Sequence, residues 1–339
     1  MVTTERLRRF PFDYYGRYRL AADVVDAVRG STPAVVLDVG GGPGSLAAFL
    51  GGDQVIASDV ALSDWHEPAP SLVMADGAAL PFADRAFDVV VTLDTLEHVT
   101  PAKRPALLRE VLRASRGWAL AVCPCATEGV AEADSALLAY VRTLFGEEFP
   151  TVTTLQEHLV FGLPDVGEVE AALGAQGVEV ARFPSGRLDR WLPMMLLFFH
   201  LMRLGRDDPV ERVQAWYNRL FYADDLRAPS YRQAFLCRLP GAQGPPLAEV
   251  VAKLLPDGPS KTIDAAGFAA LQTGLGQELV RVADDYRAKA AQLEAELAAA
   301  RADASREAAR AAALEQFRTR VLSHPLVRAR SAVRRRLGA

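Results

Sequence analysis

The stretch VVLDVGGGPGS, residues 35–45, decides how this chain folds. Its first half has the apolar composition of a buried β-strand, and the glycines that follow leave bare backbone at the end of that strand. The next residues, SLAAFL, have helical character. A ligand can lie against such a turn because no side chain stands in the way. A phosphate-binding P-loop has the pattern GxxxxGK[ST], which requires a lysine. Residues 40–45 contain no lysine and are followed by Leu46, so a P-loop is excluded.

Apolar runs with strand character recur along the chain and alternate with helical patterns such as PAKRPALLREVLRAS, residues 101–115. This alternation predicts a doubly wound α/β fold with a mostly parallel sheet and helices on both faces. The predicted strands are 34–39, 54–60, 71–76, 87–93, 118–123, 178–183 and 231–239.

The composition divides the chain after residue 240. Residues 1–240 form the predicted globular domain, with helical insertions at about 126–163 and 187–223. Proline and glycine are dense over 241–274, which predicts a linker. The apolar helix within the second insertion could cover the sheet, form an apolar ligand pocket or touch a membrane surface, and these interpretations stay open.

A long helix is predicted after the linker. Residues 275–322 are rich in Ala, Glu and Arg, and their apolar positions alternate in steps of four and three. This spacing is typical of a coiled coil, so we expect a homodimer through this helix. Residues 323–339 form a basic tail in which five arginines follow Pro325; contact with anionic lipid and a solvated end are both open for it.

Charge and cysteine content narrow the classes of partner and compartment. A net charge of −4 gives no basic face for nucleic acid, so no nucleic-acid partner is expected. The three cysteines do not form a disulfide framework, and we expect Cys123 and Cys125 to be buried thiols at a strand end in a reducing compartment. The apolar run 191–202 is shorter than the roughly 20 residues of a membrane-spanning helix. With no secretory signal at the first residues, we expect a cytoplasmic protein, with peripheral contact at the inner face of the membrane left open.

Two acids follow the glycines at the ends of the next two strands. Asp59 lies nineteen residues past Gly40, where a carboxylate can accept hydrogen bonds from both ribose hydroxyls. Asp76 lies beside Gly77 at the same predicted sheet edge, where it can accept a hydrogen bond from an adenine amino group. The glycine turn and Asp59 fit any adenosine cofactor, whereas a nicotinamide enzyme has less need of Asp76.

In order and spacing, VLDVGGGPG, VIASDV and ADGAALPFADRAFDVVVTLDTLEHV resemble a class I S-adenosylmethionine-dependent methyltransferase of the methyltransferase type 11-like group, related to the quinone-biosynthesis enzymes. The resemblance covers residues 10–125 by motif. It implies a Rossmann-like sheet of seven strands, with the last antiparallel, and S-adenosyl-L-methionine as cofactor. The residues that it places at the cofactor are Asp38, Gly40, Gly41, Gly42, Gly44, Asp59, Val60, Asp76, Gly77 and Leu93.

A site lined by carboxylates attracts the positively charged sulfur of this cofactor, whereas it would repel a dianionic dinucleotide. With an activated methyl group supplied, the protein mainly has to position an acceptor and exclude water. The candidate catalytic residues are Asp94, beside the reacting centre, and His98, a general base with an unperturbed pKa close to neutral.

A metal is a second interpretation of the same segment. Asp94, Glu97 and His98 share one face if a helical turn begins there. Some quinone O-methyltransferases carry Glu-x-x-Glu-His at this place and bind a divalent ion. Because Asp94 is a shorter arm than glutamate, we predict no metal. His158, in a second lid-like segment, is not expected to face the substrate.

The acceptor is expected to be a glycan, a lipid-linked saccharide or another small molecule with a hydroxyl. Two other classes stay open. A catalytically silent scaffold could bind the cofactor while the long helix recruits partners. An NAD-linked oxidoreductase could use the same glycine turn, although the chain lacks a Tyr-x-x-x-Lys pair.

Overall fold

We describe a computed structural model of the chain. It describes residues 3–42, 44–61, 71–175, 177–205, 207–261 and 265–323. The chain divides into two compact units, Met1–Ala265 and Ala266–Ala339, which are treated separately below.

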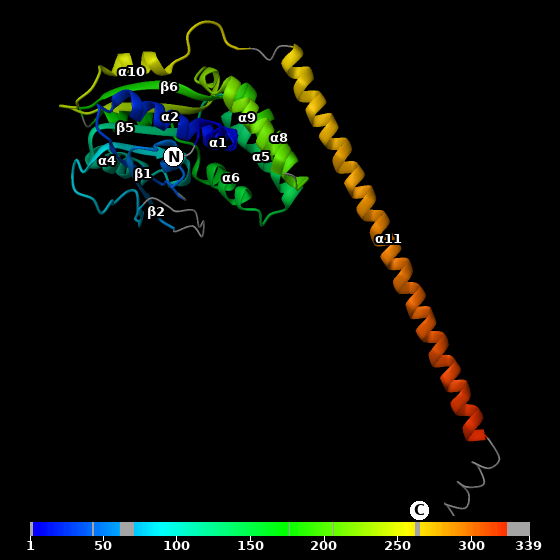
Figure 1. The fold of residues 1–339 in the computed structure, drawn as a ribbon. Coiled ribbons are helices and arrows are strands. Elements are labelled where there is room, and N and C mark those ends of the chain that lie inside the picture. Colours follow the sequence, from blue (N-terminus) through cyan, green and yellow to red (C-terminus); the bar gives the residue numbers. More distant parts are fainter. Residues whose placement is uncertain are drawn as a thin grey trace, which may run out of the picture. The chain divides into compact units, whose positions relative to one another are not determined.

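The first unit is built on one seven-stranded sheet (Figure 1). The strand order is β3-β2-β1-β4-β5-β7-β6, and β7 runs antiparallel to both of its neighbours. The predicted doubly wound, mostly parallel fold is therefore confirmed. The strands are β1 (Val35–Val39), β2 (Gln54–Asp59), β3 (Ser71–Met74), β4 (Phe87–Leu93), β5 (Ser115–Pro124), β6 (Glu179–Arg187) and β7 (Ser230–Arg238).

Helices lie on both faces of this sheet and at one end of it. The helices of the first unit are α1 (Thr4–Leu7), α2 (Phe12–Val28), α3 (Leu46–Phe49), α4 (Arg104–Ala114), α5 (Val130–Phe145), α6 (Pro150–Phe161), α7 (Val166–Gly174), α8 (Leu188–Arg203), α9 (Asp207–Phe221) and α10 (Leu247–Leu254). Two short 3₁₀ helices are η1 (Leu96–His98) and η2 (Ala223–Asp225).

Successive side chains of the central strands enter two separate hydrophobic cores, because strand side chains alternate between faces. Val36 faces the core formed with α2, α3 and α10, whereas Leu37 faces the core formed with α4 and α7. The continuous apolar run of β1 thus reflects burial on both faces, as expected for a parallel strand covered by two helical layers.

Pairing register brings the ends of three strands to one edge. Val39 lies opposite Ser58 of β2 and opposite Thr92 of β4. The residues that follow these positions, Gly40, Asp59 and Leu93, therefore meet at the carboxyl edge of the sheet. Open α/β sheets bind ligands at this edge, where the strand order reverses.

The four helices α5, α6, α8 and α9 pack against one another beside the sheet (Figure 1). Helix α8 buries Trp191, Met194 and Phe199, so its apolar face belongs in part to the core. Helix α6 contacts η1, which follows β4, and so covers the sheet edge just described. None of the helices among the described residues is long and apolar enough to cross a membrane.

The predicted domain end at residue 240 is wrong. Helix α10 lies within the predicted linker 241–274 and packs on α2 and β6. Its side chains Leu247 and Val250 are buried in the same core as β1. Proline and glycine residues form the turns before and after α10. These turns give this part of the sequence the composition of a linker.

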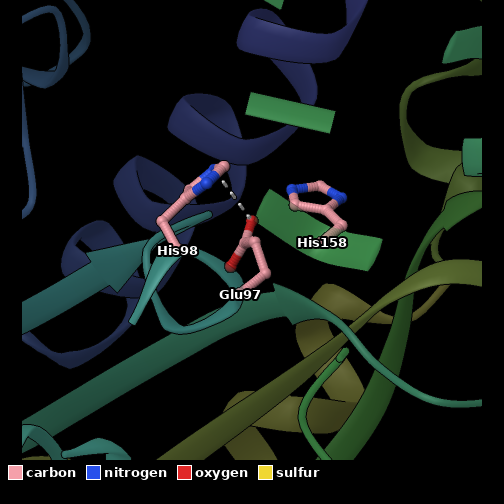
Figure 2. A group of neighbouring side chains, drawn as sticks. All are labelled: Glu97, His98 and His158. Carbon is pink, nitrogen blue, oxygen red and sulfur yellow. Dashed lines mark ion pairs between the residues drawn. The ribbon is translucent and has the colours of Figure 1, made fainter. Parts of the chain in front are cut away.

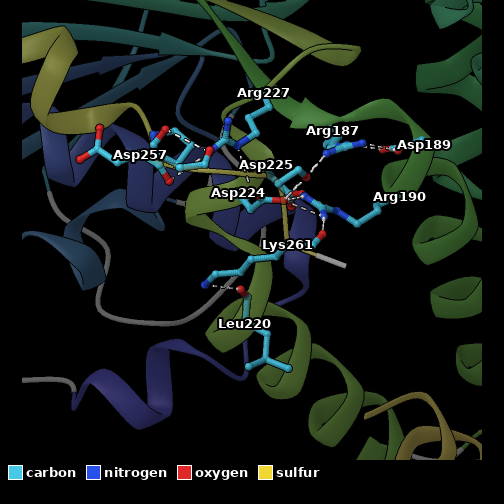
Figure 3. Close-up of polar contacts among 12 residues, drawn as sticks. Arg187, Asp189, Arg190, Leu220, Asp224, Asp225, Arg227, Asp257 and Lys261 are labelled. Atoms are coloured by element: carbon cyan, nitrogen blue, oxygen red, sulfur yellow. Dashed lines mark hydrogen bonds and ion pairs between the residues drawn. The ribbon is translucent and has the colours of Figure 1, made fainter. Parts of the chain in front are cut away.

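The residues after α10 are also fixed to the first unit (Figure 3). Arg227 donates hydrogen bonds to the carbonyl oxygens of Pro256 and Gly258, at 3.0 and 2.8 Å. The Arg190 guanidinium pairs with Asp224 and Asp225 of η2 and also donates to the carbonyl of Lys261. The globular unit therefore continues to about residue 261.

Truncation tests this boundary. A chain that ends after Pro240 loses the buried Leu247 and Val250, and we expect its free energy of unfolding to fall by about 3–6 kcal/mol. A chain that ends after Ala265 keeps both side chains and should unfold at the denaturant midpoint of the full chain's globular unit. Urea unfolding followed by tryptophan fluorescence measures both, and equal midpoints for the two truncations would contradict the boundary.

The described residues of the second unit belong to helix α11 (Ala265–Ser323). It begins ten residues before the predicted start at residue 275. Leu293, Leu297 and Leu314 are half or more exposed on it. The predicted basic tail, residues 323–339, lies outside the described residues except for Ser323.

Candidate active site

The glycine turn after β1 is held against the neighbouring strands. The amides of Gly40 and Gly41 donate to the carbonyl of Ser58, at 2.8 and 3.2 Å. Gly40, Gly42 and Gly44 all have positive φ, at 75°, 46° and 75°, which favours glycine. A Cβ on Gly41 would lie 2.7 Å from the Asp38 carboxyl carbon. The turn thus brings bare backbone over a carboxylate.

Asp38 is 1% exposed, and neither of its carboxylate oxygens has a hydrogen-bond partner among the described residues. Among the described residues, therefore, no amide of the glycine turn donates to the Asp38 carboxylate. Burial raises the pKa of Asp38 to about 7, although the Arg17 charge opposes the shift. A buried carboxyl group without a donor is costly unless a proton or a cation accompanies it.

The raised pKa makes stability depend on pH. Because the native state holds a proton on Asp38 that the unfolded chain releases near pH 4, the free energy of unfolding falls as pH rises from about 4 to about 7. Asp38→Asn removes this titration. We expect the variant to exceed the parent by on the order of 3 kcal/mol at pH 8 and to match it near pH 4. Urea unfolding at both pH values measures this, with Asp84→Asn at an exposed site as the control.

Asp59 lies at the end of β2, as predicted, and faces the glycine turn. Its Oδ2 accepts a hydrogen bond from the Gly42 amide at 2.9 Å, and its Oδ1 accepts one from the Ala61 amide at 3.2 Å. A carboxylate has about four acceptor sites, so both oxygens can still accept from a ligand. Val60, also predicted at the cofactor, is 70% exposed.

Asp76 and Gly77 follow β3. The Asp76 carboxylate is exposed and accepts hydrogen bonds from the Ala78 amide and the Lys103 ammonium, both at 2.9 Å. These two hydrogen bonds lower the pKa of Asp76. A Cβ on Gly77 would lie 3.0 Å from Leu107 and 3.1 Å from Val39, so close packing requires glycine here.

Leu93 ends β4 and is buried in the core, so only its backbone is available to a ligand. Asp94 follows it with φ at 50°, a left-handed conformation that aspartate tolerates better than most residues. Its amide donates to the Val122 carbonyl at 2.8 Å. The strained residue therefore turns the chain sharply from β4 into η1.

The Asp94 carboxylate is held by two arginines from distant segments. Arg232 of β7 donates to its two oxygens at 2.6 and 2.5 Å, and Arg17 of α2 donates to Oδ2. Burial alone would raise the pKa of Asp94, but the charges of Arg232 and Arg17 outweigh it and hold the pKa well below its usual range. Arg232 also pairs with Asp13 at 2.7 Å. Asp94 is thus a charged carboxylate bound by two arginines, and its predicted role in catalysis stays a prediction.

Helix α2 contributes Arg17 and Tyr14 to this network. The Arg17 guanidinium lies 4.3 Å from the centre of the Tyr14 ring and binds Asp94. Arg19 pairs with Asp23 of its own helix instead. Helix α2 therefore contributes a cation that fixes the end of β4.

His98 ends η1 beside this network, with its side chain 29% exposed. Its Nδ1 lies 2.8 Å from a Glu157 carboxylate oxygen of α6. Burial lowers the pKa of His98, and the nearby His158 adds to the effect. The neutral imidazole that results can accept a proton at Nε2, since Nδ1–H donates to Glu157.

The structure adds a residue that the sequence did not predict at this site. His158 of α6 lies beside His98, with 4.9 Å between the ring centroids. Its Nδ1 is 2.8 Å from Asp134 of α5, and the Tyr231 hydroxyl donates to the other oxygen of Asp134 at 2.6 Å. The contact joins residues sixty positions apart, so no local pattern predicts it. The one hint in the sequence is that His158 lies in a lid-like segment.

The sheet order with an antiparallel β7, the glycine turn and the acid at the end of β2 are together the features of a class I methyltransferase fold. Residues 37–120 match the family described as methyltransferase domain. This match to a methyltransferase domain includes the glycine turn, as the resemblance implied.

Curated relatives extend this match. An uncharacterized methyltransferase of Mycolicibacterium gilvum is 36% identical over 130 residues, which is 33% of this chain and 49% of the relative. An uncharacterized methyltransferase of Mycobacterium marinum is 37% identical over 115 residues, or 30% of this chain and 44% of the relative. The chain thus spans about half the length of the curated relatives it matches.

Solved structures with a similar fold include a putative methyltransferase from Bacillus halodurans, at 18% identity and a TM-score of 0.37, covering 65% of this chain and 96% of that one. Another is the magnesium protoporphyrin IX methyltransferase of Synechocystis, solved with S-adenosylhomocysteine bound. It is 14% identical with a TM-score of 0.39, and the match covers 67% of this chain and 85% of that one.

Proposed function

We propose that this chain is an S-adenosylmethionine-dependent methyltransferase that methylates a hydroxyl oxygen of a glycan, lipid-linked saccharide or other small molecule. The observation that carries the proposal is the buried Asp38 carboxyl group, which has no hydrogen-bond partner within the described part of the chain and lies under a turn of bare glycine backbone. A cationic ligand would compensate this carboxylate, whereas a dianionic dinucleotide would not.

The residues present fit the cofactor at each of its parts. Asp38 would pair with the positive charge of the methionine portion, which would lie against the bare backbone of the glycine turn. Asp59 would accept from the ribose hydroxyls, and Asp76 with Gly77 would lie at the adenine. The cofactor supplies a methyl group activated by the positive charge on its sulfur. An acidic site fits this charge by simple electrostatics.

On the acceptor side, the centre around His98 handles the proton. Its neutral imidazole is oriented by Glu157 at Nδ1, which leaves Nε2 able to accept the proton of the acceptor hydroxyl. Asp94 acts through position, because its ion pairs fix the turn that carries η1. Helix α6 packs on η1 and so lies beside this centre.

Incubation with methyl-labelled S-adenosylmethionine and a panel of saccharides, phenols and quinols tests the proposal. We expect label in one acceptor class and one S-adenosylhomocysteine per methyl group transferred. Binding of S-adenosylhomocysteine without turnover on any acceptor would support the silent scaffold instead. Binding of NAD in preference to it would support an oxidoreductase.

Variants assign the roles in the same assay. Asp59→Asn should weaken S-adenosylhomocysteine binding by about 1–3 kcal/mol in calorimetry, because ribose hydroxyls lose a charged acceptor. His98→Gln should lower turnover by on the order of 10²-fold or more and leave that binding unchanged. Asp84→Asn, at an exposed pair with Arg113, is the matched control for both.

Pairing of α11 with a second copy is part of this proposal. Exposed Leu293, Leu297, Leu314 and Val321 repeat at coiled-coil spacing, which supports a homodimer. Sedimentation of the full chain against a chain ending after Ala265 decides this. A monomeric full chain would overturn it. We also propose that the protein is cytoplasmic and contacts the membrane peripherally.

A further inference from the structure

Three potential metal ligands from two segments meet beside the sheet edge. Glu97 and His98 lie in η1, and His158 lies in α6 (Figure 2). One ligand atom from each lies within 4.8 Å of the others. Figure 2 shows the His158 ring beside the pair formed by Glu97 and His98, whose Nε2 and Oε1 are 4.0 Å apart.

Two of these side chains are buried with unused polar atoms. Glu97 is 1% exposed and His158 is 7% exposed. Glu97 Oε2 and His158 Nε2 have no hydrogen-bond partner among the residues that the structure describes. A buried polar atom without a partner costs free energy, so such a pair at one place indicates an absent ligand.

The second nitrogen of each histidine is already oriented by a carboxylate. Asp134 lies 2.8 Å from Nδ1 of His158, and Glu157 lies 2.8 Å from Nδ1 of His98. The hydrogen bonds assign the proton to Nδ1 in both rings and leave each Nε2 with a free lone pair. Histidines that bind metals are oriented in this way by carboxylates.

Asp134 is itself fixed. Its second oxygen accepts from the Tyr231 hydroxyl of β7 at 2.6 Å, and it is 1% exposed. A buried aspartate and a buried tyrosine therefore together orient the ring of His158. A histidine that only fills space would not need this arrangement.

The set of ligands differs from the one considered in the sequence, because Asp94 is excluded. Both of its oxygens are bound by Arg17 and Arg232. His158 takes the third position instead. Two imidazole nitrogens and a carboxylate favour zinc, iron, manganese or cobalt over magnesium or calcium, which prefer oxygen ligands.

We propose that Glu97, His98 and His158 bind one divalent transition-metal ion, with Asp134 and Glu157 as the residues that orient its histidine ligands. Zinc–nitrogen distances of about 2.0–2.1 Å require the three side chains to draw together from their present spacing. Three protein ligands leave a coordination position open. The role of the ion rests on the proposed function: it would bind the hydroxyl of the methyl acceptor and lower the pKa of that hydroxyl.

The base role proposed above for His98 applies to the chain without the ion, because with the ion bound its Nε2 is a ligand and cannot take the proton. The bound hydroxyl loses its proton to solvent more readily because the ion stabilises the alkoxide. Loss of turnover in His98→Gln fits both roles, so activity cannot separate them. Direct measurement of metal binding does so, and it needs neither cofactor nor acceptor.

The test uses the full chain, freed of metal with a chelator and then titrated with Zn²⁺ or Co²⁺. We expect one ion per chain by elemental analysis and calorimetry, and a Co²⁺ visible spectrum without the thiolate charge-transfer band. That band would instead assign the ion to Cys123 and Cys125. Absence of stoichiometric binding would overturn the site while leaving methyl transfer and S-adenosylhomocysteine binding as an independent result.

Variants locate the ion. Glu97→Gln and His158→Gln should each lower Zn²⁺ affinity at least tenfold, and Asp134→Asn should lower it 10- to 100-fold through the ring orientation. His200→Gln changes an exposed histidine that is bonded to Tyr140, and should bind Zn²⁺ as the parent does. Circular dichroism checks that each variant is folded. Unchanged affinity in the folded double variant of Glu97 and His158 would overturn the proposal.

Discussion

Asp94→Asn is expected to lower the free energy of unfolding by about 3–5 kcal/mol, because it leaves two buried arginines without their shared carboxylate. Arg232 is 5% exposed and Arg17 is 13% exposed at the side chain, so water cannot replace the lost charge. Asparagine tolerates the left-handed backbone at this position, so the loss reports the charge and not the turn. Urea unfolding with an unchanged m-value measures it.

Two further variants control this result. Asp84→Asn also removes an ion pair, 2.7 Å from Arg113, but the Asp84 carboxylate is 75% exposed, so we expect a change below about 1 kcal/mol. Adding Arg17→Gln to Asp94→Asn removes one of the unpaired cations and should recover part of the loss. If Asp94→Asn costs no more than Asp84→Asn, the network does not stabilise the fold.

Gly40→Ala is expected to cost about 3 kcal/mol and to abolish tight binding of S-adenosylhomocysteine. An added Cβ would lie 2.5 Å from Thr95 Cγ2 and 2.9 Å from Thr95 Cβ, so the turn after β1 would have to move away from β4. Its φ of 75° adds strain for any residue with a Cβ. Strain of about 1–2 kcal/mol and overpacking of about 1–3 kcal/mol together give this magnitude.

Other glycines separate the two causes. Gly42→Ala meets only Asp59 Oδ2, at 3.8 Å, so it should show the strain alone, at about 1–2 kcal/mol. Gly52→Ala has nothing within 4 Å and should be nearly neutral. In the Gly40→Ala background, Thr95→Gly should restore the steric part. The prediction fails if Gly40→Ala and Gly52→Ala have the same unfolding midpoint.

The sequence predicted the sheet well because its signals are local. An apolar strand must be followed by glycine where the backbone turns with positive φ, and that pattern appears at Val39 and Gly40. Parallel strands then bring their carboxyl ends together, so the placement of Asp59 beside the glycine turn followed from the order of elements alone.

Partners of the charged side chains could not be predicted in the same way. Asp94 binds Arg232, which lies 138 positions further along the chain. The sequence suggested that Asp94 would share a face with Glu97 and His98. In the structure, Asp94 has a left-handed backbone and its carboxylate binds Arg17 and Arg232 instead. No periodicity in the sequence signals an ion pair between an early helix, a strand end and the last antiparallel strand.

By itself, then, the sequence determined the strands, the glycine turn and the class of fold, because backbone conformation and burial impose residue types over short distances. Tertiary structure decided which titratable groups face one another. The packing of α6 on η1 brings His158 to His98 and Glu97, and the antiparallel β7 supplies both Arg232 and Tyr231. Such contacts depend on the path of the chain between elements, which local residue patterns do not encode.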